Sequence, residues 1–156
     1  FEFSISPWGE NMTSTPFWLG TLLVIAAVIL QAGIAPVPIV LGLSLALAIR
    51  NRLLTTLGWA AGGAVLLEVM SIAPVGTVAL PVIIAAGATQ LISSRWLIAV
   101  GPWRTSATLL GGSALGAGSD ALLQGWSVRE ALPVGIFAFA LAAAWAIILK
   151  LLARTP

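Results

Sequence analysis

Two carboxylates inside apolar stretches are the residues whose chemistry most needs an explanation. Glu68 and Asp120 each lie late in a predicted helix, surrounded by aliphatic residues. A buried ionised carboxylate is costly unless it is paired or hydrogen-bonded. One interpretation is a polar centre between helices that serves as a proton or ion site, a substrate contact or a docking point for a partner helix. The other is structural: each acid caps backbone or hydroxyl groups and holds the helices in register.

The surroundings of the two acids are alike. Asp120 stands 52 residues after Glu68 (120 − 68), and each acid is followed eleven residues later by Ala-Leu-Pro-Val, at Ala79–Val82 and Ala131–Val134. Such a period suggests a tandem duplication of a helical hairpin, although a chain rich in Ala and Leu gives some matches by chance. A duplication would bring both acids to the same depth in the fold.

The composition predicts a membrane protein. Of the 156 residues 60% are hydrophobic and 8% are charged, and the mean hydropathy is +1.09. A soluble domain of this length cannot enclose that much apolar surface in its core.

The residue types also exclude several kinds of chemistry. The chain has no Cys, His or Tyr, which excludes thiolate and His-ligated metal sites, His-ligated haem and Ser-His-Asp catalysis. The net charge of +2 is too small for a nucleic-acid-binding surface. We therefore expect no catalytic residues, no metal, no cofactor and no nucleic-acid partner.

The residues that interrupt the apolar stretches predict an all-α protein with six transmembrane helices. The first apolar stretch, Phe17–Ile49, would be about 50 Å long as one helix, against a hydrocarbon core of about 30 Å. Gly33 and the prolines Pro36 and Pro38 divide it. The predicted helices are 17–34, 37–49, 53–72, 78–94, 105–123 and 131–149. They form one domain, 17–156, after a polar or interfacial tail, 1–16.

The positions of the basic residues predict the orientation. With six spans, one side of the membrane receives Arg50, Arg52, Arg95, Arg104, Lys150 and Arg154, and the other receives only Arg129. The positive-inside rule then places both termini in the cytoplasm. Five tryptophans near predicted helix ends are expected to be interfacial anchors, and Trp145, deeper in its helix, is expected to pack internally. The five are Trp18, Trp59, Trp96, Trp103 and Trp126.

Small residues in the third and fifth predicted helices indicate close helix packing. They are Gly58, Gly62, Gly63, Gly111, Gly112, Gly116 and Gly118. Ala107 and Ala114 belong to the same face, because they lie four residues before Gly111 and Gly118. The face that they form is predicted to contact either a neighbouring helix of this chain or the helix of a partner. Loop residues Pro74, Gly76 and Trp126 are further candidates for partner contact, beside the two acids.

The order of these features resembles the MreD family of small bacterial membrane proteins. The resemblance rests on a Leu-Gln-x-x-Ile motif at Leu30–Ile34, the glycine-led helix with an acid at Gly63–Glu68, the VGTxAL-type segment Val75–Leu80, and a second acid, Asp120. It covers roughly residues 17–152. The first acid is Glu rather than Asp and lies one position further from the glycine than in the family's pattern, and the first loop is shorter.

The resemblance implies a non-enzymatic scaffold of the cell-shape and peptidoglycan-elongation machinery in the bacterial cytoplasmic membrane. Its partners would be an MreC-like protein and the complex of RodA with its transpeptidase. The family also resembles in shape the substrate-binding subunits of energy-coupling-factor vitamin transporters. Two alternatives therefore stand beside the scaffold: a substrate-binding subunit for a small solute or vitamin, and an accessory subunit of another membrane complex.

These alternatives differ in what the interior should contain. A binding subunit should enclose an outward-facing pocket lined by Glu68, Asp120 and tryptophans such as Trp126. A scaffold should have a filled interior and leave a small-residue or apolar face for its partner.

Overall fold

The computed structural model describes residues 15–34, 37–71, 74, 76–96 and 102–152. Within these ranges the chain forms six α-helices and no strand, which confirms the all-α prediction. The helices are α1 (Phe17–Ile34), α2 (Ile39–Arg50), α3 (Leu53–Ser71), α4 (Ala79–Trp96), α5 (Pro102–Gln124) and α6 (Val128–Leu152). Arg154 and all but the last two residues of the predicted tail lie outside the described residues.

Two helices begin earlier than the sequence predicted. Helix α5 starts at Pro102 instead of Thr105, because proline fits the first position of a helix, where no N–H bond is required. Helix α6 starts at Val128 instead of Ala131. The boundaries of α1 agree with the prediction.

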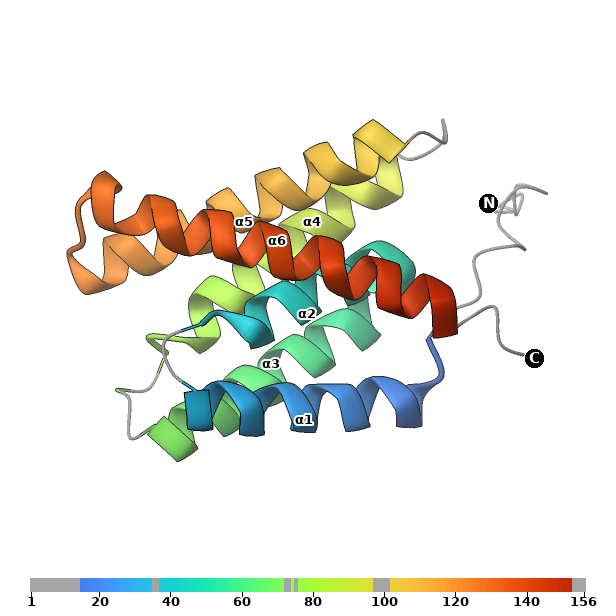
Figure 1. Ribbon diagram of the computed structural model, residues 1–156, viewed down its shortest axis with the longest axis horizontal. Helices are drawn as coiled ribbons and strands as arrows, with labels where there is room; N and C mark the ends of the chain where they lie inside the picture. The colour runs from blue at the N-terminus through green and yellow to red at the C-terminus, as the bar shows by residue number, and fades with distance from the viewer. Residues whose placement is uncertain (1–14, 35–36, 72–73, 75, 97–101, 153–156) are drawn as a thin grey trace, which may run out of the picture.

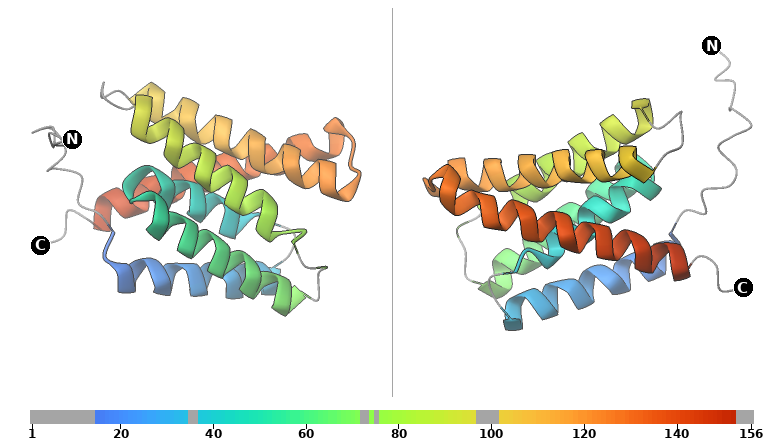
Figure 2. Two further views of the ribbon diagram at one scale, coloured as in Figure 1. Left: turned by 180° about the vertical axis from the view of Figure 1, so that it is seen from behind. Right: turned by 45° about the horizontal axis from the view of Figure 1, so that its top comes forward.

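Successive helices run in opposite directions. Phe17 at the start of α1 and Leu152 at the end of α6 therefore lie at the same end of the bundle (Figures 1 and 2). Helices α3 and α6 are long and apolar enough to cross a membrane, whereas α1, α2 and α4 are apolar but shorter.

Helix α2 lies at the centre and contacts all five other helices (Figure 1). Every residue from Val40 to Ala48 is buried, and Leu45 and Leu47 are completely enclosed. With 12 residues, α2 is only about 18 Å long. It therefore fills the interior without needing the length of a membrane span.

Helix α2 approaches α6 closely at Gly42. A Cβ atom built there would lie 2.7 Å from the Cβ of Leu141 and 3.1 Å from the backbone nitrogen of Ala142 on α6. Contact at this distance is open only to a residue without a side chain. Gly42 therefore sets the distance between the central helix and α6.

The five outer helices expose large apolar side chains. Leu54 on α3 is 84% exposed and Leu122 on α5 is 86% exposed, and α1, α4 and α6 show the same pattern. Exposed apolar surface of this extent is typical of contact with lipid or with other proteins.

Helix α1 is attached to α3 through Trp59. Its indole is 5% exposed, stacks on Phe17 with ring centroids 5.7 Å apart, and donates from Nε1 to the Thr21 hydroxyl at 3.2 Å. Gly20 leaves the space that the indole occupies. The prediction of Trp59 as an interfacial anchor was therefore wrong, because its ring fills the seam between two helices. Trp145 packs against the core, as predicted.

Replacing Gly42 by alanine should destabilise the bundle, because the new methyl group meets the α6 backbone. We expect a loss of about 1–3 kcal/mol in the free energy of unfolding, as for other overpacked sites. Unfolding of the purified protein in detergent measures it. The control is Gly62→Ala on α3, where nothing lies within 4 Å of the added atom. Equal stability of the two variants would show that the contact between α2 and α6 at Gly42 is looser than the structure indicates.

Candidate functional site

The Glu68 carboxylate caps the start of α4. Its Oε1 atom accepts hydrogen bonds from the backbone N–H groups of Val78 and Ala79, both at 2.8 Å. These are among the donors that a helix start leaves without partners. Glu68 is only 6% exposed, so water does not replace it in this role. The carboxylate thus joins α3 to the helix that follows it.

The loop between these helices supports the cap. Gly76 adopts a φ of 90°, a conformation that favours glycine. The Thr77 hydroxyl donates to the carbonyl of Pro74 at 2.8 Å. Pro74 is exposed and Gly76 half-buried, so these two partner candidates lie at a turn whose conformation Glu68 helps to fix.

Other helix ends are capped by similar means. The Gln31 Oε1 atom on α1 accepts from the backbone N–H of Val40 at the start of α2, at 2.8 Å. At the start of α6, the Glu130 carboxylate accepts from both the backbone N–H and the hydroxyl of Ser127, at 2.8 Å each. The Ser-x-x-Glu spacing is the sequence signature of a capping box, and it lies between the predicted helices 105–123 and 131–149.

This capping box makes the two halves of the suggested repeat differ. The offset that aligns Glu68 with Asp120 also aligns Val78 with Glu130. In α6, however, the N–H of Glu130 already bonds to the Ser127 carbonyl at 3.0 Å. Helix α6 begins nearly one turn earlier than the repeat predicts. The N–H group that Asp120 would cap by analogy with Glu68, that of Glu130, therefore already has an acceptor.

Asp120 instead lines a small pocket of about 200 Å³ at the same end of the bundle as the α5–α6 turn. It is half-buried, and its Oδ1 atom accepts a hydrogen bond from the Gln124 amide one turn later. The pocket lies between the starts of α2 and α4 and the adjoining ends of α5 and α6. Its other polar side chains are Gln31, Gln124 and Trp126.

The two acids do not share a site. Glu68 is on α3 and Asp120 on α5, and these helices are not in contact in the described part of the chain. The wall of the Asp120 pocket on the α4 side is formed by Val78, Pro81 and Val82. Glu68 bonds to the same segment but does not line the pocket.

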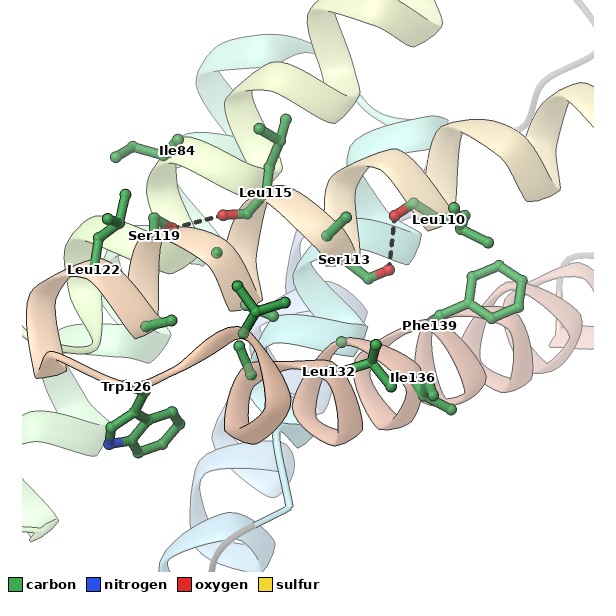
Figure 3. Close-up of a pocket in the computed structure, with 17 residues that line it drawn as sticks. Ile84, Leu110, Ser113, Leu115, Ser119, Leu122, Trp126, Leu132, Ile136 and Phe139 are labelled. Atoms are coloured by element: carbon green, nitrogen blue, oxygen red, sulfur yellow. Dashed lines mark hydrogen bonds between the residues drawn. The ribbon is translucent and has the colours of Figure 1, made fainter.

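An apolar groove of about 830 Å³ runs over α5, between α4 and α6 (Figure 3). Ile84 from α4 lies on one side, and Leu132, Ile136 and Phe139 from α6 lie on the other. Small residues of α5 form its floor, including Ala114, Ala117, Gly118 and Ala121.

The groove offers little to a polar ligand. The Ser113 hydroxyl donates to the Leu110 carbonyl at 2.9 Å, and the Ser119 hydroxyl donates to the Leu115 carbonyl at 2.8 Å (Figure 3). Among the described residues, no charged side chain lines it. Trp126, which is 39% exposed, is at one end, where the α5–α6 turn begins.

The seven glycines predicted to form a packing face divide into two groups. Gly63, Gly112 and Gly116 lie against neighbouring helices: a Cβ on Gly63 would meet Val24, one on Gly112 would meet Thr89 and Leu45, and one on Gly116 would meet Leu41 and Ala85. The other four, Gly58, Gly62, Gly111 and Gly118, have nothing within 4 Å of the position that a Cβ atom would take. Only Gly118 of these four lines the groove.

The basic residues lie at helix ends. Arg50 ends α2, Arg52 precedes α3, Arg95 is near the end of α4, Arg104 is in the first turn of α5 and Lys150 is in the last turn of α6. In the antiparallel bundle these positions share the end where α1 begins (Figure 1). The Arg104 guanidinium stacks over the Trp103 ring at 5.4 Å.

Comparison with known proteins identified no relative: no family model, no curated protein and no solved structure matches this chain. Among the described residues, no group of three or more His, Cys, Asp or Glu side chains is placed to hold a metal ion. The two cavities and the caps are thus the features from which a function has to be inferred.

Replacing Glu68 by alanine should lower the stability of the bundle by about 1–3 kcal/mol, because the half-buried N–H group of Val78 and the buried N–H group of Ala79 lose their acceptor. Glu68→Gln keeps an oxygen at the same place and should restore most of the loss. Glu130→Ala, at an exposed cap, should have a smaller effect. Thermal unfolding in detergent is the measurement, and full stability of Glu68→Ala would assign Glu68 a role other than capping.

Proposed function

We propose that this chain is a non-enzymatic, multi-pass scaffold of the bacterial cytoplasmic membrane that holds the transmembrane helix of a partner protein against α5. The observation that carries this proposal is the apolar groove over α5, with its floor of small residues and its walls of large ones. Small residues allow two helix backbones to approach closely in a membrane, where no hydrophobic force drives helices together.

Several features support six crossings of the membrane. The outer helices expose apolar side chains, and α3 and α6 pass a test of length and hydropathy for a membrane span. The antiparallel order gathers the basic helix ends at one end of the bundle and leaves Arg129 at the other (Figure 1). By the positive-inside rule we place the basic end, where α1 begins and α6 ends, on the cytoplasmic side.

The small size of the Asp120 pocket and the lining of the groove favour a scaffold over a solute-binding subunit. The interior between the outer helices is filled by α2. The Asp120 pocket has about 200 Å³, whereas pockets for small molecules hold about 300–1,000 Å³. The larger groove has no free hydrogen-bond donor on its serines to orient a polar solute.

The motifs that resemble MreD acquire a structural meaning in this fold. The glycine of the Gly63–Glu68 stretch lies against Val24 of α1, and its acid bonds to Val78 and Ala79 of the VGTxAL-type segment. The two motifs therefore form one unit that closes the α3–α4 hairpin. On this basis we propose an MreD-like role in the elongation machinery, with an MreC-like protein as the partner in the groove and RodA with its transpeptidase in the wider complex.

Filling the groove should release the partner. In Gly118→Leu, the new side chain enters the groove without meeting an atom of its own chain within 4 Å of the Cβ. We expect at least tenfold lower recovery of the MreC-like protein when the variant is purified from its own membranes in mild detergent.

Gly62→Leu is the matched control, because Gly62 is an equally open helix glycine on α3, away from the groove. It should recover the partner as the unmodified chain does. Equal recovery by both variants would remove the groove from the interface. Recovery of ATPases with a coupling subunit, in place of a wall-synthesis protein, would favour the transporter alternative.

A further inference from the structure

The acidic pocket and the apolar groove adjoin each other. Ala117 and Trp126 line both cavities. Asp120 is on the same helix as the groove floor, one turn beyond Gly116. A chain that occupies the groove therefore passes next to the pocket at the end marked by Trp126.

The pocket has the charge to bind a cation. No basic side chain lines it in the described part of the chain, and the hydrogen bond to Asp120 there comes from the neutral Gln124 amide. At the helix starts that border the pocket, the N–H groups of Val40 and Val78 already donate to Gln31 and Glu68, so these two groups do not attract an anion.

The size of the pocket limits the cation. About 200 Å³ admits the end of one side chain and is smaller than the cavities that hold small organic ligands. A long basic side chain can lay its apolar stem along apolar surface and hold its charged end in a polar site some distance from the helix. Ionisable side chains within membrane spans commonly pair with one another.

We propose that the partner helix in the α5 groove carries a lysine or arginine near its non-cytoplasmic end, and that this side chain enters the pocket and pairs with Asp120. The inference rests on the proposed function and specifies the partner: an apolar helix with one basic residue level with Trp126. The apolar contact supplies the adhesion, and the ion pair fixes the depth and direction of the partner.

A lipid amine is the competing occupant of the pocket. The shape of the groove favours a helix, because its floor of Ala114, Ala117 and Gly118 lies between walls formed by Ile84 and Leu132. Ridges of one helix fit into such a groove of another.

Synthetic helices test the inference. Each probe is an apolar Leu/Ala helix of about 20 residues with one lysine near one end. The set of probes places this lysine at each position of one helical turn. The matched control helix has leucine in place of the lysine. The chain has no cysteine, so Ser94→Cys on the exposed end of α4 takes one fluorophore. Energy transfer then gives the affinity in vesicles of phosphatidylcholine and phosphatidylglycerol.

We expect the best lysine probe to bind at least tenfold more tightly than the leucine probe, a difference of about 1.4 kcal/mol. The preference should disappear in Asp120→Asn, which keeps the shape of the side chain. It should persist in Glu130→Gln, which removes an acid that does not line the pocket.

Each other result has a definite meaning. If both probes bind equally and Gly118→Leu weakens both, the groove remains a docking site and the ion pair is refuted. If Gly118→Leu changes neither, the proposed function fails as well, and absence of binding by any probe refutes both. If added phosphatidylethanolamine abolishes the lysine preference, the pocket belongs to a lipid amine and the inference is wrong.

Discussion

The structure depends on one constraint: a helix that starts among apolar side chains must find acceptors for its first N–H groups. Glu68 meets this need for α4 and Gln31 meets it for α2, in both cases from the preceding helix. Each bond therefore satisfies the start of one helix and fixes the angle between two. At the other end of α2, the Asn51 amide donates to the Leu47 carbonyl and accepts from the N–H of Thr15.

Asp120 is distinctive because the fold does not use it as a cap. The acid at the equivalent position of the suggested repeat, Glu68, is used within the fold, whereas α6 has its own cap in Ser127 and Glu130. Asp120 is thereby left facing a pocket with a neutral amide as its neighbour. In the second half of the suggested repeat the acid does not serve as a cap, which leaves it available for recognition.

The sequence predicted the number of helices and most of their ends, because prolines and glycines interrupt an otherwise continuous apolar pattern. The sequence also contains the local signals for the start of α6, Ser127 and Glu130, but the predicted helix begins after them, at Ala131. The central position of α2 was not predictable, since its apolar residues have no periodicity that separates lipid from protein. For the same reason the glycines of α5 did not reveal that Gly112 packs inward and Gly118 lies open; that depends on which neighbour each face meets.

The enclosure of α2 has a consequence for biogenesis. The ribosome delivers α2 before four of the helices that cover it, and Gly42 meets its neighbour on α6 only when the last helix has been made. Until those helices have been made, α1 is the one neighbouring helix that can cover the apolar surface of α2. The interval before α3 to α6 arrive is therefore the stage of synthesis at which the apolar residues of α2 are least covered.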